Sequence, residues 1–332
     1  MPSTTPFRFI LVPVDGSKLA EQAIPTALAI AQRTRAKVRL VLVHHEFQPL
    51  MFMEPGEIYI RTRLAIEKAD REYLTELVQH LRAEEGKALT SALLKGPVAP
   101  TLVEYARDIG ADLVVMTSHG RGGVRRAWLG SVADELVRTL EVPLIVVRPS
   151  EKGTAPEPIS LRKIGVPLDG SSLAEAVLEP VTALARMWDA EISLVQVVRP
   201  IGLASDPPLF PTGYSDQETR IRRDVAQDYT QDVVERLRGL GVKATGVVLL
   251  GAAIPDTLLH FFHTEGVGLV AMATHGRGGV RRLVLGSVAD KLIRAAEVSV
   301  MVVRPRSKAR RGRGRGGKAK GSFASALVLS TV

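Results

Sequence analysis

A glycine-rich stretch that leads into a serine offers the clearest chemistry in this sequence. Three glycines follow His119 closely, and a further pair, Gly130 and Ser131, stands where a segment of helical periodicity begins. Glycines let backbone amides approach an anion closely, and the first turn of a helix presents N–H groups that have no intrahelical partner. Arg121 adds a cationic donor suited to phosphate. The pattern predicts a phosphate-binding loop. The alternative is a glycine-rich turn in which Ser131 caps its own helix and the arginines are solvated.

The same chemistry occurs twice in the chain. Residues 117–134 recur at 273–290, an offset of 156, and residues 10–17 recur at 164–171, an offset of 154. A period of this size is that of a domain and far exceeds the period of a solenoid repeat. The chain is therefore predicted to be a tandem duplication, and the second copy of the loop carries Gly276, Arg277, Gly286 and Ser287.

An aspartate follows the first apolar run of each copy. Asp15 and Asp169 both precede a Gly-Ser pair. At the point where strand order reverses in a parallel sheet, such a carboxylate can reach a ribose hydroxyl, an adenine edge or a metal ion. An aspartate before Gly-Ser is also good N-cap chemistry, and the two roles are compatible.

Apolar runs and amphipathic segments alternate along both copies, and they provide the elements that position these residues. Strands separated by helices predict βαβ units and a parallel sheet. In the first copy we expect strands at 9–14, 38–43, 89–94, 112–116 and 142–147, with helices at 18–33 (kinked at Pro25), 58–85, 98–108 and 130–140. In the second we expect strands at 163–168, 192–198, 244–250, 268–273 and 299–303, with helices at 172–188, 218–240, 254–264 and 286–296.

The predicted fold class is α/β, with two tandem flavodoxin-like domains, each a five-stranded parallel sheet with helices on both faces. We expect domains at residues 1–149 and 162–305, a linker at 150–161 that is rich in proline, glycine and charge, and a disordered basic tail at 306–332.

Charge and composition narrow the classes of function. The chain has 332 residues and a formal net charge of +9, but eight basic residues and no acidic one lie beyond residue 305. Residues 1–305 hold 36 basic and 35 acidic side chains, so the basic character belongs to the tail. The absence of cysteine excludes thiol chemistry and disulfides. Without a signal-peptide pattern or an apolar run of about 18 residues, we expect a soluble cytoplasmic protein.

The paired motifs resemble those of the universal stress protein family. The first is Val-Pro-Val-Asp-Gly-Ser at residues 12–17, and the second is Ser-His-Gly, nine residues and Gly-Ser-Val at residues 118–132. The resemblance covers residues 7–149 and 162–305. It implies two adenine-nucleotide α-hydrolase-like domains packed as a pseudo-dimer, in which the last strands, 143–148 and 299–304, pair with each other. A homodimer of chains is a further option.

The ATP-binding branch of that family has Gly, two residues, Gly, nine residues and then Gly-Ser or Gly-Thr. The resemblance thus implies that ATP, with Mg²⁺ as an accompanying ion, binds as a regulatory ligand. The residues implied to bind it are Pro13, Asp15, Val43, Gly120, Arg121, Gly130, Ser131 and Val132 in the first copy, and Pro167, Asp169, Val197, Gly276, Arg277, Gly286, Ser287 and Val288 in the second.

One position departs from that motif. Its first glycine is Thr117 in the first copy and Ala273 in the second. A Cβ at this place crowds a nucleotide unless the backbone keeps a negative φ. Since alanine adds only a methyl group, whereas threonine is branched at Cβ, nucleotide binding is better supported in the second copy.

Enzymatic roles find little support in the sequence. No Gly-x-Ser-x-Gly elbow and no Asp-Ser-His order accompany His119 and His275, so the sequence does not predict a hydrolase triad. We therefore expect no catalytic residues and no enzymatic activity beyond slow ATP hydrolysis. His44 and His45 lack a spaced carboxylate, so no metal site is expected. Two alternatives remain open: non-specific nucleic-acid binding through the Arg-Gly tail, and an interaction module without a ligand.

Overall fold

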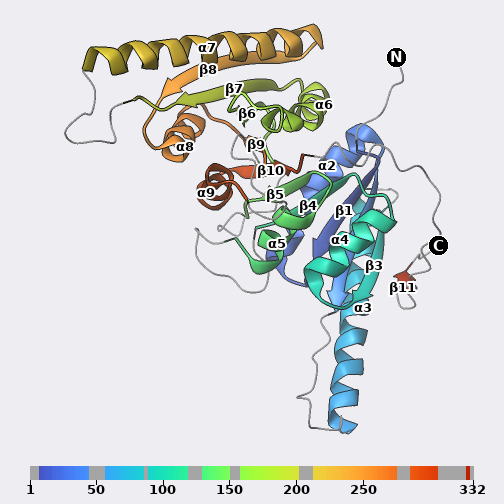
Figure 1. The fold of residues 1–332 in the computed structure, drawn as a ribbon. Coiled ribbons are helices and arrows are strands. Elements are labelled where there is room, and N and C mark those ends of the chain that lie inside the picture. The colour runs from blue at the N-terminus through green and yellow to red at the C-terminus, as the bar shows by residue number, and fades with distance from the viewer. Residues whose placement is uncertain are drawn as a thin grey trace, which may run out of the picture.

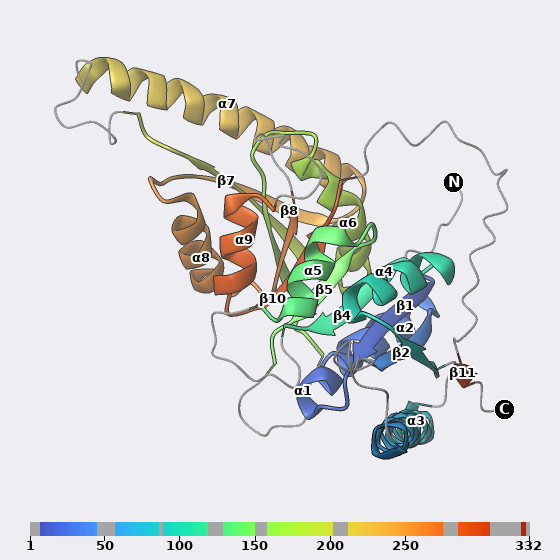
Figure 2. The same ribbon diagram turned by 60° about the horizontal axis from the view of Figure 1, so that its bottom comes forward.

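The computed structural model describes residues 7–44, 57–85, 89–118, 129–149, 158–201, 212–274, 285–305 and 327–329. The strands of these residues form a single eleven-stranded sheet with the order β11-β3-β2-β1-β4-β5-β10-β9-β6-β7-β8 (Figures 1 and 2). Among the described helices, none is long and apolar enough to cross a membrane.

Both halves of the sheet follow the predicted alternation of strands and helices. The first half contains β1 (Phe9–Val14), α1 (Lys18–Glu21), α2 (Ile24–Thr34), β2 (Lys37–His44), α3 (Glu57–Glu85), β3 (Leu89–Lys95), α4 (Val98–Asp108), β4 (Leu113–Thr117), α5 (Ser131–Thr139) and β5 (Leu144–Val147). The second contains β6 (Lys163–Pro167), the 3₁₀-helix η1 (Ala174–Val177), α6 (Leu178–Trp188), β7 (Glu191–Val198), α7 (Thr212–Gly239), β8 (Lys243–Leu250), α8 (Ile254–Thr264), β9 (Leu269–Ala273), α9 (Ser287–Ala295) and β10 (Ser299–Val303). All strand pairs within each half are parallel, so the predicted fold class is confirmed.

Two apolar cores lie on opposite faces of the sheet. Consecutive residues of β1 point to different cores, Ile10 to one and Leu11 to the other, because side chains alternate along a strand. Helices α2, α3, α6 and α7 cover the first core, and α4, α5, α8 and α9 cover the second. Burial on both faces explains why the central strands are nearly all apolar.

The expectation of one kinked helix at residues 18–33 is wrong, because the chain makes two helices there. Pro25 lies in the first turn of α2, where its missing N–H costs nothing, but it could not continue a helix from α1. The turn between them closes with hydrogen bonds to the residue three positions earlier, from Gln22 N to Leu19 O at 3.2 Å and from Ala23 N to Ala20 O at 3.3 Å. The second half has the 3₁₀-helix η1 at the corresponding place, ahead of α6.

At one place in the core, the two halves combine a large and a small residue in opposite order. The first pairs a large residue on its first strand, Leu11, with the small Ala106 on α4, and both are buried. At the repeat-equivalent places the second half has Gly165 on β6 and Phe262 on α8. A Cβ added to Gly165 would lie 2.6 Å from Cε1 of Phe262, so the phenyl ring occupies the space that a side chain at 165 would need.

The halves join through an antiparallel pair formed by their last strands. Residues 144–146 of β5 lie opposite residues 300–302 of β10, with Ile145 opposite Met301 at the centre. Both of these side chains are completely buried. The pairing implied by the family resemblance is confirmed. We call β5, β10 and the neighbouring helices α5 and α9 the seam.

Repeated charged residues link α5 to α9 across the seam. Within each helix an arginine binds the aspartate one turn before it: Arg138 Nε lies 2.9 Å from Asp134, and Arg294 Nε lies 3.0 Å from Asp290. Arg294 also reaches across the seam to Asp134 Oδ1 at 2.7 Å. The reciprocal contact, from Arg138 to Asp290, is longer at 3.8 Å. The two helices lie side by side in Figure 2.

A second pair of arginines crosses the seam to the helix ends. Arg148, directly after β5, donates to the carbonyl oxygens of Ile293 and Arg294 near the end of α9. Arg304, directly after β10, donates to the carbonyl oxygens of Arg138 and Thr139 at the end of α5. The last carbonyls of a helix lack intrahelical partners and carry partial negative charge, so each half caps the other half's helix.

Part of the tail expected to be disordered is ordered. Residues 327–329 form β11 (Leu327–Leu329), which pairs antiparallel with the outer edge of β3. The apolar Leu-Val-Leu sequence can use an exposed strand edge as a template, which composition alone did not indicate. Residues 306–326 and 330–332 lie outside the described part of the chain.

The complementary volumes at Gly165 and Phe262 yield a stability prediction. Gly165→Leu should lower the free energy of unfolding by about 1–3 kcal/mol through overpacking. Phe262→Ala should lower it by about 3–5 kcal/mol by leaving a cavity. The double variant restores the Leu–Ala arrangement of the first half, so its loss should be well below the sum. Denaturant titration measures all three. Gly239→Leu is the control, because a Cβ there meets nothing within 4 Å. Additive losses would contradict the prediction.

The pairing of Asp134 with two arginines predicts a stability that depends on pH. A hydrogen bond from Arg138, helped by the charges of Arg138 and Arg294 and opposed by partial burial, lowers the pKa of the Asp134 carboxyl below its ordinary value. This stabilisation is fully present above the unfolded-state pKa, near pH 4, and is lost as the pH falls through the lower folded-state pKa.

At neutral pH, Asp134→Asn should therefore be less stable than the natural chain by roughly 1 kcal/mol or less, because the pair is partly exposed. The difference should shrink below about pH 4. Urea midpoints measured at several pH values test this. Glu135→Gln, which removes an exposed charge from the same helix, is the control. A difference that stays constant with pH would refute the linkage.

Candidate functional site

The strand order places a reversal at the same point in both halves. From β1 the chain adds β2 and β3 on one side, and then crosses to add β4 and β5 on the other. The second half repeats this between β6 and β9. Ligands of doubly wound sheets bind outside the carboxyl ends of the strands that flank such a reversal. The segments that leave β1 and β4, and their counterparts after β6 and β9, therefore define the two candidate sites.

The turn after the first strand has the same geometry in both halves. Oδ1 of Asp15 accepts hydrogen bonds from the backbone N–H of Ser17 at 2.9 Å and from its hydroxyl at 2.6 Å. Oδ1 of Asp169 accepts the same pair from Ser171 at 3.0 and 2.6 Å. The glycine between them, Gly16 in the first half, has a positive φ of 83°, which favours glycine.

The N-cap interpretation of the two aspartates needs correction. Ser17, not Asp15, is the N-cap of α1, and its Oγ accepts from the backbone N–H of Ala20 at 3.1 Å. In the second half Oγ of Ser171 accepts from Ala174 N at 3.1 Å. The aspartate holds the capping serine in place, so a strand end, a tight turn and a helix start form one rigid unit at the sheet edge.

The helix after the fourth strand starts directly after a glycine. Gly130 is the N-cap of α5, so the proposal that Ser131 caps its own helix is wrong, because Ser131 is already the first helical residue. Gly286 and Ser287 repeat this at α9. Glycine offers no side-chain cap, so within the described residues no side chain caps the first-turn N–H groups, and an exposed serine lies beside them.

Hydrogen bonds tie these helix starts to the sheet. Gly130 N donates to Ser118 O at 2.9 Å, and Gly286 N donates to Thr274 O at 3.1 Å. Ser118 and Thr274 in turn donate to the last residues of β5 and β10, Val147 and Val303. These bonds hold the N-terminus of α5 at the carboxyl end of β4 and the N-terminus of α9 at the carboxyl end of β9.

Thr117 and Ala273, which replace the first glycine of the motif, are the last residues of β4 and β9. Both lie in extended strands and pair with Val147 and Val303. Neither is among the described residues with positive φ, so the backbone here does not require glycine. Thr117 is buried and Ala273 is half-buried.

Six further predicted residues lie at or near the same edge. Val43 and Val197 are the next-to-last residues of β2 and β7, half-buried and packed against the second core. Pro13 and Pro167, also half-buried, lie at the ends of β1 and β6 that precede the Asp-Gly-Ser turns. Val132 and Val288 follow the exposed serines on α5 and α9.

The remaining predicted residues fall outside the described part of the chain. These are Gly120, Arg121, Gly276 and Arg277, together with both histidines of the loops, His119 and His275. The structure therefore brings the Asp turn, the apolar strand end and the helix start to one edge in each half, and the arginines remain predictions from the sequence.

A tyrosine–glutamate pair that the sequence did not reveal supports each turn. Tyr229 on α7 donates its hydroxyl to Glu175 of η1 at 3.0 Å, and Tyr73 on α3 donates to Glu21 of α1 at 3.2 Å. Burial, and then the nearby Glu175, raises the pKa of the Tyr229 phenol, and the charge of Asp169 contributes. The pair therefore lies close to the aspartate turn and links it to the long outer helix. The repeat offsets, 156 for tyrosine and 154 for glutamate, are the signal that could have found it.

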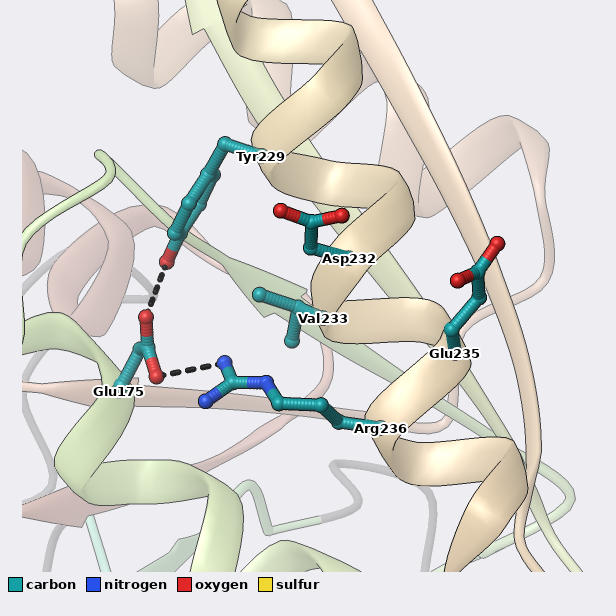
Figure 3. Close-up of a pocket in the computed structure, with 6 residues that line it drawn as sticks. All are labelled: Glu175, Tyr229, Asp232, Val233, Glu235 and Arg236. Carbon is teal, nitrogen blue, oxygen red and sulfur yellow. Dashed lines mark hydrogen bonds and ion pairs between the residues drawn. The ribbon is translucent and has the colours of Figure 1, made fainter.

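Figure 3 shows that this pair in the second half lines a groove between η1 and α7. Arg236 binds the other oxygen of Glu175 at 2.7 Å, and Asp232, Val233 and Glu235 complete the lining. Three carboxylates against one arginine make the groove unsuited to phosphate. None of the predicted nucleotide-binding residues lines it.

The described residues contain no group of three side chains that could hold a metal ion. His44, at the end of β2, does have a carboxylate partner: its Nδ1 lies 2.8 Å from Oδ2 of Asp70 on α3, and both side chains are buried. A single histidine and a single carboxylate stabilise the packing of α3 on the sheet, and they fall short of a metal-ligand set.

Comparison with known proteins agrees with this architecture. A universal stress protein of Mycolicibacterium smegmatis is 27% identical over 305 residues, covering 90% of this chain and 97% of that protein. A universal stress protein of Mycobacterium tuberculosis H37Rv is 26% identical over 316 residues, covering 89% and 94%. The crystal structure of a universal stress protein from Archaeoglobus fulgidus shares the fold with a TM-score of 0.61 at 17% identity, covering 90% of this chain and 96% of that one.

The family model itself matches twice, once in each half of the sheet. The universal stress protein family covers residues 6–148 and again residues 160–304. Together these matches span most of the chain, and they include both Asp-Gly-Ser turns and both glycine-started helices. The chain therefore belongs to the universal stress protein family, with a family domain in each half.

Proposed function

We propose that this member of a stress-response family binds ATP as a regulatory ligand in each half, outside the carboxyl ends of the parallel strands. The observation that carries the proposal is a duplicated arrangement. A glycine-started helix, held to the end of the fourth strand, shares one sheet edge with a rigid Asp-Gly-Ser turn after the first.

Each part of the edge suits one part of a nucleotide. The first-turn N–H groups and positive dipole end of α5, at Gly130 and Ser131, suit phosphate oxygens, and the exposed Ser131 hydroxyl adds a donor. Asp15, beside the strand reversal, suits a ribose hydroxyl. Val43 offers an apolar surface for a base. In the sequence, Arg121 follows β4 closely and supplies cationic charge.

A regulatory ligand accounts for these groups better than a substrate does. Asp15 and Asp169 hold the capping serines in position. In this role Oδ1 of each aspartate already accepts a hydrogen bond from a serine hydroxyl. The groups assigned to phosphate are backbone N–H groups, a serine and an arginine, which bind charge and do not abstract a proton from water. We infer slow hydrolysis at most.

The second half should be the tighter site. Thr117 and Ala273 hold the same extended strand-end position, so the difference between them is the size of the side chain beside the ligand. The methyl group of alanine leaves more room for a nucleotide than the branched threonine. Mg²⁺ would accompany ATP as its usual counterion, with no protein ligand assigned to it.

Removal of each serine hydroxyl tests the two sites. Ser287→Ala should weaken ATP binding by roughly tenfold, the value of one hydrogen bond to a charged group. Ser131→Ala should change the overall titration less, because the first half is the weaker site. Calorimetric titration of nucleotide-free protein measures both, together with identification of any nucleotide released on denaturation. If the natural chain binds no ATP at millimolar concentration, the proposed function is wrong.

A methyl group at the helix start separates a binding effect from a folding effect. Gly286 has φ −61° and ψ 144°, which alanine adopts readily, and an added Cβ would lie 3.5 Å from Thr274 O, an ordinary contact. Gly286→Ala should keep the natural thermal midpoint within about 2 °C. Its affinity for ATP should fall at least as far as that of Ser287→Ala, because the methyl group lies where phosphate must approach. Unchanged affinity would place the nucleotide elsewhere.

A further inference from the structure

The sheet has two outer edges, and within the described residues only one of them is covered. β8 is the last strand in the order, and β7 is its one partner there. From Gly246 to Leu250 it carries no charged residue and no proline, the two devices that normally protect an edge from pairing. Its charged residue, Lys243, lies at the start of the strand and binds Asp189.

The register identifies β8 as the counterpart of β3. On β2, Leu42 lies opposite Leu93 of β3. The repeat equivalent of Leu42 is Gln196, which lies opposite Val248 of β8. Val248 therefore corresponds to Leu93, and Gly246 to Ser91. The two strands occupy the same place at the outer end of their halves.

The β3 edge shows what covers such a strand. β11 pairs with it in antiparallel register, Leu327 opposite Leu93 and Leu329 opposite Ser91. On β3, Leu93 is 2% exposed and Ser91 is 3% exposed.

The matched positions on β8 are all more accessible. Gly246 is exposed, Val247 and Val248 are half-buried, and Leu250 is 47% exposed. The β8 edge presents more apolar surface than β3, where the residue equivalent to Leu250 is Lys95. An apolar strand would bury this surface and satisfy the backbone groups of the edge.

The described part of the chain has one such strand for two such edges. Strands lie about 4.8 Å apart, so the end of β10 is roughly 29 Å from the β11 position and roughly 24 Å from the matching position beyond β8. The 23 residues between β10 and β11, 304–326, can span either distance. Within the described residues, one of the two edges stays uncovered wherever Leu327–Leu329 pairs, and a strand from another molecule can cover it.

We propose that the outer edge of β8 is a docking site for the C-terminal strand, Leu327–Leu329, of a second copy of this chain, which adds antiparallel as β11 does on β3. The site accepts a short extended apolar segment by main-chain hydrogen bonds, with side chains packing over Val247 and Val248. The tail then partitions between β3 of its own chain and β8 of a partner, and it connects the molecules.

A synthetic decapeptide with the sequence of residues 323–332 tests the site on the full chain. The natural protein should bind one equivalent, because its own tail keeps β3 covered. Val248→Lys should weaken that binding by roughly tenfold or more, because it places a charge on the edge. The full-length variant Val328→Lys, whose own strand is impaired, should bind two equivalents, one on each edge. Labelled peptide and fluorescence anisotropy give the stoichiometry.

Two readouts guard against a folding artefact. Hydrogen exchange on the natural protein should show peptide-dependent protection of amides in residues 245–250, with no substitution needed. Sedimentation should show concentration-dependent self-association of the natural protein that Val328→Lys weakens. The proposal is overturned if the peptide protects β3 alone, or if it binds Val248→Lys as well as the natural chain. It is equally overturned if self-association persists in Val328→Lys, which would assign the contact to another surface.

Discussion

The antiparallel pairing of β5 with β10 is the constraint on which the rest of this molecule depends. Two parallel five-stranded sheets, each with its own hydrogen-bond pattern, become one sheet because their last strands meet in opposite directions. That pairing brings α5 and α9 together on one face (Figure 2). It also sets the arginines after the two strands, Arg148 and Arg304, against the carboxyl ends of the opposite helices. Each half thus supplies a cap that the other half's helix lacks.

A single helical turn separates the residues of the seam from the proposed ligand sites. Asp134, which binds Arg294 of the other half, donates its backbone N–H to the carbonyl oxygen of Gly130, the residue that starts α5. Asp290 repeats this contact with Gly286 in α9. The helices whose first turns are proposed to bind phosphate, α5 and α9, are therefore the same helices that contact each other across the seam. Elsewhere the copies have diverged, as the exchange of Leu11 and Ala106 for Gly165 and Phe262 shows, because core volume can be conserved by several pairs of residues.

The sequence was sufficient for the features that depend on local patterns. Strands such as 9–14 and 299–303 were predicted to the residue, because a strand buried on both faces is a continuous apolar run between polar turns. The repeat and the Asp-Gly-Ser and Gly-Ser motifs predicted residues that the structure brings to one sheet edge in each half. Features that depend on contacts distant in sequence could not be predicted. Asp70 is 26 residues from His44, and nothing in the spacing indicates that a helix returns it to the strand end.

The same distinction explains the errors at Pro25 and at the tail. The apolar periodicity continues past Pro25 and therefore predicted one helix. Pro25 instead lies in the first turn of α2, because a proline is tolerated there but interrupts a helix that starts before it. The basic, glycine-rich composition of the tail concealed three apolar residues whose strand exists only because β3 offers an edge.

That edge is itself a consequence of the duplication. Once β5 and β10 have paired, the outermost strands of the two repeats are β3 and β8, and within the described residues β11 covers β3. An asymmetry between the edges is thus built into a tandem protein that carries one terminal strand.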